Sequence, residues 1–304
     1  MSATLFASGF KKNLRALSGY ALGMVFYVWL FIWVFPSFAG SRGLNLLLRD
    51  LPQGLLRVLG YSVGVSNLSG FLGGEFYSLL YLLIMGVYAV FSASRLMAHL
   101  IDNRSMAYLL ASPVSRGRVA TTQAMVLVSG VLVIGGITTA GGLLGAHWFA
   151  PHASLPAGPF LALNLVGILL FAVVAAYSFL FSCIAPDERS ALGLSAAVTL
   201  LMYGIHVVGD LSSRVQWLAH LSLFTAFNSQ QLIHGQGPVL ADSLGLAAGA
   251  IVLLAVAVAL FQRRQLSLER PRWPGDARGV EPGASPVVVA HVTHLRRTLP
   301  SGTI

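Results

Sequence analysis

The sequence has few charged residues and a single cysteine, and each scarcity excludes some classes of protein. Only 10% of the 304 residues are Asp, Glu, Lys or Arg, whereas 56% are hydrophobic, and the mean hydropathy is +0.77. A soluble protein carries about 25% charged residues, so most of this surface cannot face water. The single cysteine, Cys183, excludes an intrachain disulfide and a cysteine metal cluster. The composition predicts an all-α integral membrane protein.

Motifs for nucleotide and metal chemistry are also missing from the sequence. It contains neither G-x-x-x-x-G-K-[ST] nor H-E-x-x-H, so it binds no ATP through a P-loop. Ionisable residues are scarce inside the apolar runs, where such residues usually mark ion or proton paths. His206 and Asp210 are four residues apart near the outer end of one run, and this spacing places them on one helix face. They are interpreted mainly as a boundary histidine paired with its neighbour, and alternatively as a substrate or proton site.

Six apolar runs are each long enough to cross a bilayer as a helix, which needs about 20 residues. They cover residues 19–38, 75–96, 119–144, 160–184, 191–209 and 239–261. Residues 1–18 mix apolar and basic side chains and predict an amphipathic interfacial helix. Residues 210–238 predict one or two short helices on the outer side. Residues 263–304 predict a basic, proline-rich cytoplasmic tail without a core, so that residues 19–262 form the transmembrane domain.

The positions of the basic residues orient these six spans. Fifteen of the nineteen Lys and Arg residues fall in segments assigned to one side, and only Arg42, Arg49, Arg57 and Arg214 fall on the other. Cytoplasmic segments carry such an excess of positive charge. The asymmetry therefore predicts a multi-pass protein with both termini in the cytoplasm, and it explains the net charge of +9 without a nucleic-acid partner.

Glycines provide a packing signal in two of the spans. Small residues let membrane helices approach closely, and we interpret these glycines as contacts inside the chain ahead of contacts with a second chain. The glycines concerned are Gly135, Gly136, Gly141, Gly142 and Gly145 in the third span, and Gly245 and Gly249 in the sixth.

A polar segment, residues 101–118, separates the second span from the third and has a pattern of its own. Asp102 or Asn103 is suited to cap a helix, and Met106, Leu109 and Leu110 form one apolar stripe at helical spacing. Ser112-Pro113 ends the helix, because the residue before a proline is disfavoured in the α region. The segment is predicted to be a short amphipathic helix at the cytoplasmic membrane face.

This segment resembles the cytoplasmic coupling helix of ABC-2-type transporter permeases. The matching residues are Arg104, Leu109, Leu110, Ser112, Pro113, Ser115 and Arg116, whereas Tyr108 stands where many relatives have an acidic residue. The resemblance extends over about residues 5–262 and includes an N-terminal elbow helix, six spans and an outer segment before the last span. Its Leu221-Ser222-Leu223-Phe224 is similar to the Leu-Ser-Pro-Phe of the family, with Leu223 in place of proline.

The resemblance implies a permease subunit of an ATP-binding cassette exporter in a plasma membrane, such as the bacterial inner membrane. Separate ATPase subunits would bind ATP and Mg²⁺, the chain itself would hold no cofactor, and a second permease copy or a homologous permease would complete the transporter among membrane lipids. The residues expected to dock on the ATPase are Asp102, Asn103, Arg104, Met106, Tyr108, Leu109, Leu110, Ser112, Pro113, Ser115 and Arg116.

Other classes of function remain open at the level of sequence. An ion- or proton-coupled secondary transporter would need buried ionisable groups and shows duplicated halves in many families. A membrane-embedded enzyme would need a nucleophile beside its base. Ser195 and His206 are eleven residues apart and therefore about 16 Å apart along one helix, which is too far. A membrane scaffold or immunity factor without transport activity is a further alternative.

Overall fold

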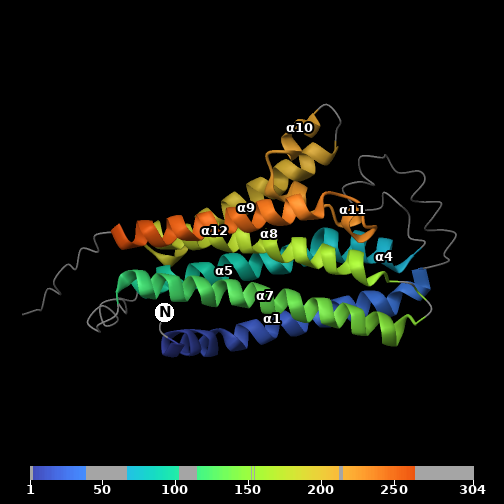
Figure 1. The fold of residues 1–304 in the computed structure, drawn as a ribbon, viewed down its shortest axis with the longest axis horizontal. Coiled ribbons are helices and arrows are strands. Elements are labelled where there is room, and N and C mark those ends of the chain that lie inside the picture. The colour runs from blue at the N-terminus through green and yellow to red at the C-terminus, as the bar shows by residue number, and fades with distance from the viewer. Residues whose placement is uncertain are drawn as a thin grey trace, which may run out of the picture. The chain divides into compact units, whose positions relative to one another are not determined.

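The computed structural model describes residues 3–38, 67–102, 115–151, 153, 155–211 and 215–263, and this part of the chain contains helices and no strand (Figure 1). Six of the helical segments are long and apolar enough to cross a membrane. The chain is thus a multi-pass membrane protein of the all-α class. The elements are α1 (Ala3–Phe38), α4 (Leu68–Phe71), the π-helix η1 (Leu72–Leu80), α5 (Tyr81–Asp102), α7 (Arg116–Phe149), α8 (Ala157–Ile184), α9 (Glu188–Leu211), α10 (Gln216–Ala219), the 3-10 helix η3 (Leu223–Ala226), α11 (Ser229–Ile233) and α12 (Val239–Arg263).

The first helix contains both the predicted elbow and the first span without a break. One buried stripe continues through the predicted boundary at residue 18, because positions three and four apart share a helix face. Its members are Leu17, Ala21, Met24, Val28, Ile32 and Phe35. No proline interrupts the helix before Pro36, near its end. The structure therefore does not show a separate elbow helix.

The second span begins earlier than the sequence predicts. Residue 75 was the expected start, but the membrane-length helix runs over Leu68–Met97. The Asn67 side chain accepts a hydrogen bond from Gly70 N at 2.7 Å and caps this helix, and Leu68, Phe71 and Leu72 are buried. The burial of these residues places them in the second span, which the sequence predicted to start only at residue 75. The remaining spans agree with the predicted runs to within about five residues. The described part of residues 210–238 contains three short helices, α10, η3 and α11, where the sequence predicted one or two.

Helix α8 lies in the middle of the bundle. In its most apolar window 72% of the residues are buried, and it contacts α5, α7, α9, α11 and α12. An aromatic cluster joins it to η1 and α5. Tyr81 lies edge-on to Phe171 of α8 and stacked against Phe227, with ring centroids 5.9 and 5.8 Å away. The Tyr77 hydroxyl donates to Asn164 Oδ1 at 3.1 Å, so a buried polar pair is satisfied inside this core.

The glycines of α7 allow close packing against α1 and α8. The Trp29 indole donates a hydrogen bond to the carbonyl oxygen of Gly141 at 2.8 Å. A Cβ at Gly145 would lie 2.7 Å from the Trp29 ring, and one at Gly142 would lie 2.5 Å from the Phe160 ring. Packing inside the chain is thus confirmed for these glycines. The interpretation was wrong for Gly136 and Gly245, because an added Cβ at either position would meet no atom within 4 Å.

The substitution Gly142→Ala is expected to lower the stability of the bundle, because the Phe160 ring is fully buried and cannot move away. Overpacking of this kind costs about 1–3 kcal/mol. The matched control is Gly136→Ala, which meets no atom within 4 Å and should stabilise by about 0.5–1 kcal/mol through helix propensity. Thermal unfolding in detergent micelles measures both. Equal midpoints for the two variants would contradict the packing at Gly142.

Candidate functional site

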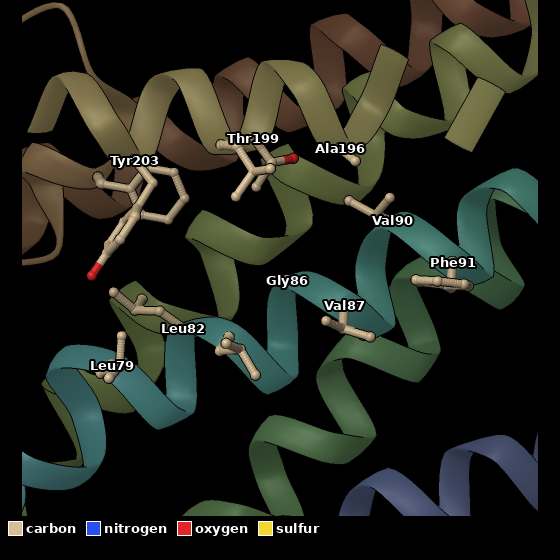
Figure 2. A pocket seen from close by; sticks show the side chains of 12 residues that line it. Leu79, Leu82, Gly86, Val87, Val90, Phe91, Ala196, Thr199 and Tyr203 are labelled. Atoms are coloured by element: carbon tan, nitrogen blue, oxygen red, sulfur yellow. The ribbon is translucent and has the colours of Figure 1, made fainter. Parts of the chain in front are cut away.

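An apolar groove lies between α5 and α9. It has a volume of about 300 Å³. Figure 2 shows α5 along one wall and α9 along the other, with Gly86 of α5 near the middle. The residues that line this α5–α9 groove are Leu79, Leu82, Leu83, Gly86, Val87, Val90, Phe91, Ala196, Thr199, Leu200, Tyr203 and Phe224. The lining predicts a preference for a lipophilic occupant, because ligand pockets are mainly apolar with few polar groups.

The groove exists because α9 packs loosely against the rest of the bundle. Only 11% of its most apolar window is buried, against 72% for α8. Figure 1 shows α9 leaving the layer of α5 and α8 toward α10. Small residues, Gly86 and Ala196, lie where the two walls face each other, and an added Cβ on Gly86 would meet only the Phe171 ring, at 3.7 Å. The walls therefore do not close on each other.

Specific contacts are formed where α9 begins. Asp187 precedes the helix, and its carboxylate accepts hydrogen bonds from Ser190 N at 2.7 Å and from Ser190 Oγ at 3.1 Å. These hydrogen bonds, the backbone one first, lower the pKa of Asp187. Arg95 Nε lies 3.8 Å from Glu188 Oε1, so the end of α5 and the beginning of α9 are neighbours.

The second half of α9 is held by the short helices that follow it. The Ser222 hydroxyl donates to the Met202 carbonyl oxygen at 2.7 Å. The Tyr203 ring lies edge-on to Phe224 at a centroid distance of 5.5 Å. Near the end of α9, Gly209 lies against the backbone of Ala219. A Cβ built on Gly209 would be only 2.6 Å from the Ala219 nitrogen. The short helices α10 and η3 and the residues between them thus hold the second half of α9.

Two hydroxyl groups supply the polarity of the groove. Thr199 Oγ1 donates to the Ser195 carbonyl oxygen at 2.7 Å and lies 2.6 Å from the Tyr177 hydroxyl. Since the one proton of Thr199 is already used, the Tyr177 hydroxyl is the donor of the second bond. Tyr203 extends its hydroxyl away from α9 at one end of the groove (Figure 2), where it forms no hydrogen bond with a described residue. The groove therefore offers one available donor beside an apolar wall.

The predicted pair on α9 does meet, but outside the groove. His206 Nε2 lies 3.5 Å from Asp210 Oδ2, which confirms the contact predicted from the four-residue spacing. Neither residue lines the groove. The interpretation as a histidine paired with its neighbour is thus the one that the geometry favours.

Most of the predicted docking residues lie outside the described residues, which stop at 102 and resume at 115. Those outside are Asn103, Arg104, Met106, Tyr108, Leu109, Leu110, Ser112 and Pro113. Asp102 ends α5, Ser115 is the N-cap residue of α7 without a side-chain hydrogen bond, and Arg116 begins α7. The coupling helix therefore stays a prediction.

The α5–α9 groove was not predicted from the sequence. It depends on the poor burial of α9, which an apolar run does not reveal.

Within the described residues, no group of three or more His, Cys, Asp or Glu side chains is placed to hold a metal ion. A scan of protein-family models finds no match to the chain, and no curated protein matches it significantly.

The hydrogen bond between Tyr177 and Thr199 is expected to couple α8 to α9. In a double-mutant cycle with Tyr177→Phe and Thr199→Val, the two changes should be non-additive by about 0.6 kcal/mol, the average for hydrogen bonds between membrane helices. Unfolding in mixed micelles measures the free energies. Thr139→Val is the matched control, because Thr139 bonds only its own helix, at the Gly135 carbonyl. Additive effects of Tyr177→Phe and Thr199→Val would show that the bond does not join the helices.

Proposed function

We propose that this chain is the membrane-spanning permease subunit of an ATP-binding cassette exporter. The observation that carries the proposal is the Leu-Leu-x-Ser-Pro-x-Ser-Arg pattern of residues 109–116, placed between the second and third of six membrane-length helices. The contact of Arg95 with Glu188 supports it, because it sets the turn before α9 at the end of the bundle where α5 ends and α7 begins. One end of the bundle thus gathers the segments that an ATPase would touch.

In this proposal the ATPase is a separate polypeptide and binds the ATP and Mg²⁺. Residues 102–116 dock in a groove of the ATPase, with Met106, Leu109 and Leu110 as the apolar contact. Because this segment joins α5 directly to α7, a displacement of the docked segment moves the ends of both helices. The wall of the α5–α9 groove formed by α5 then moves with it. A second permease copy, or a homologous permease, completes the path of the substrate through the membrane.

The α5–α9 groove is the candidate surface for a lipophilic substrate in this mechanism. Its apolar walls favour hydrocarbon, and the Tyr203 hydroxyl gives one point of orientation. The competing functions have less support among the described residues. His206 and Asp210 pair near the end of α9 and not at mid-span, and intramembrane charges that carry ions are expected to face the bundle interior or a cavity. We therefore do not advance a secondary transporter or a membrane enzyme.

The proposal predicts that residue 105 faces the cytoplasm. In a Cys183→Ser background, a cysteine at Ser105 should resist a membrane-impermeant maleimide applied to intact cells and react after permeabilisation. A cysteine at Gln236 is the matched control and should react in intact cells, because this exposed residue follows α11 between spans five and six. Labelling of Ser105→Cys in intact cells would overturn the orientation.

The paired change Leu109→Asp with Leu110→Asp is expected to remove the ATPase from the complex. Burial of one leucine contributes about 1.5–3 kcal/mol, so the loss of two should weaken binding by more than a hundredfold. The measurement is co-purification of a P-loop ATPase with the tagged full-length chain, together with its ATP hydrolysis.

Leu221→Asp is the control for this experiment, because Leu221 is 61% exposed in the segment between spans five and six, away from the docking end. The amount of each variant in the membrane fraction separates docking from insertion. A well-inserted double mutant that keeps its ATPase at wild-type stoichiometry would refute the coupling-helix assignment. Absence of any P-loop ATPase from the wild-type complex would refute the exporter itself.

A further inference from the structure

A second groove runs between α7 and α12 and differs from the first in having positively charged residues beside one end. It has a volume of about 780 Å³, and Phe6 of α1 contributes to its lining. The lining residues on α7 are Thr121, Ala124, Met125, Val128, Ser129 and Leu132, and those on α12 are Leu254, Ala255, Val258, Ala259 and Gln262. Two helices that meet over part of their length thus leave a long open groove between them on the surface of the bundle.

The length of this α7–α12 groove matches one leaflet of a bilayer. Thr121 and Leu132 are eleven residues apart, which is about 16 Å along a helix. The hydrocarbon core of a bilayer is about 30 Å thick, so one leaflet takes about half of that. The dimension fits a single acyl chain that lies parallel to the helices.

The walls of the groove are apolar although two of its residues carry hydroxyl groups. Thr121 Oγ1 donates to the Gly117 carbonyl oxygen at 2.8 Å, and Ser129 Oγ donates to the Val126 carbonyl oxygen at 2.8 Å. Both hydroxyl groups therefore bond their own helix and offer the groove little polarity. The amide of Gln262 is the polar group at the end of the groove near Thr121.

Positive charge gathers at that same end. The Gln262 side chain lies against Gly117, whose missing side chain leaves room for it. Arg118 follows Gly117, and it is three residues before Thr121 and seven before Met125, so it shares the helix face that lines the groove. Arg263 follows Gln262. Both arginine side chains are exposed and form no ion pair with a described residue. A long apolar groove that ends in exposed cations is complementary to an acyl chain that ends in an anion.

We propose that the α7–α12 groove is a binding site for an anionic glycerophospholipid. One acyl chain lies between Met125 and Val258, and the phosphate lies at Arg118 with the Gln262 amide beside it. The site goes beyond the proposed transport function and does not depend on it. A bound lipid covers a surface at which α7 and α12 would otherwise leave a gap.

Photo-crosslinking of the full-length chain in nanodiscs tests this site. The probes are phosphatidylglycerol and phosphatidylcholine of the same chain length, each with a diazirine in one acyl chain. The phosphatidylglycerol probe is expected to label peptides from residues 121–132 and 254–262 in preference to phosphatidylcholine. Arg118→Gln should reduce this labelling about fivefold, which is the contribution of one cation near an anionic lipid surface, and Arg118→Lys should retain it.

Two matched controls accompany these variants. Arg189→Gln removes an exposed arginine from another helix at the same end of the bundle and should leave labelling unchanged. Ala259→Phe fills the groove and should reduce labelling by both probes, whereas Ala248→Phe, at an exposed site of α12 outside the groove, should not. Size-exclusion chromatography verifies that each variant is folded.

Three results would overturn the proposal. Equal labelling by the two probes would show that the groove holds any lipid without selecting the headgroup. Crosslinked peptides from elsewhere in the chain would place the lipid at another surface. If Ala259→Phe left labelling unchanged but converted a dimer to a monomer in light scattering, the groove would be an interface with a second copy of the chain.

Discussion

The burial of α8 is the constraint on which the other helices of this bundle depend. In lipid, helices gain little from leaving the solvent, so close packing and hydrogen bonds hold them together. Helix α8 supplies that packing on most of its surface. The Phe171 ring packs against Tyr81, and Asn164 accepts a hydrogen bond from the Tyr77 hydroxyl. The Phe160 ring packs against Gly142 of α7. The helices that touch α8 on only one side, above all α9, are consequently the ones with exposed faces and grooves.

Uneven burial divides the bundle into a packed part and an open part. The most apolar windows of α9 and α12 are 11% and 22% buried, while those of α5 and α7 reach about half or more. Leu200 and Leu244 expose 69% and 70% of their surface, so these faces meet lipid or another protein. The same division places both grooves beside a poorly buried helix. It also explains why the glycine pair of α12 has no tight contact within the chain, whereas Gly135, Gly141, Gly142 and Gly145 of α7 do.

The long apolar runs predicted the number and order of the spans, because six stretches of helix are the simplest way to satisfy the backbone inside lipid. Local capping and tertiary burial decided the boundaries that failed. Asn67 starts the second span well before Glu75, and the stripe that begins at Leu17 crosses the expected boundary at residue 18 within the single helix α1. The pairing of His206 with Asp210 was predictable, since both lie on one helix. The grooves were not, because they depend on how far separate helices stand apart.

The hydroxyl groups inside the spans have a consequence for the order in which this protein assembles. Ser94, Thr121, Ser129, Thr138 and Ser195 each bond a carbonyl oxygen three or four residues earlier in their own helix. Such bonds need no neighbour, so each of these helices enters the bilayer with those hydroxyl groups already satisfied. The Trp29 indole and the Gln230 amide instead donate to carbonyl groups of another helix, at Gly141 and Gly70. The hydroxyl bonds within one helix therefore form before the helices meet. The bonds of Trp29 and Gln230 form only when the inserted helices come together.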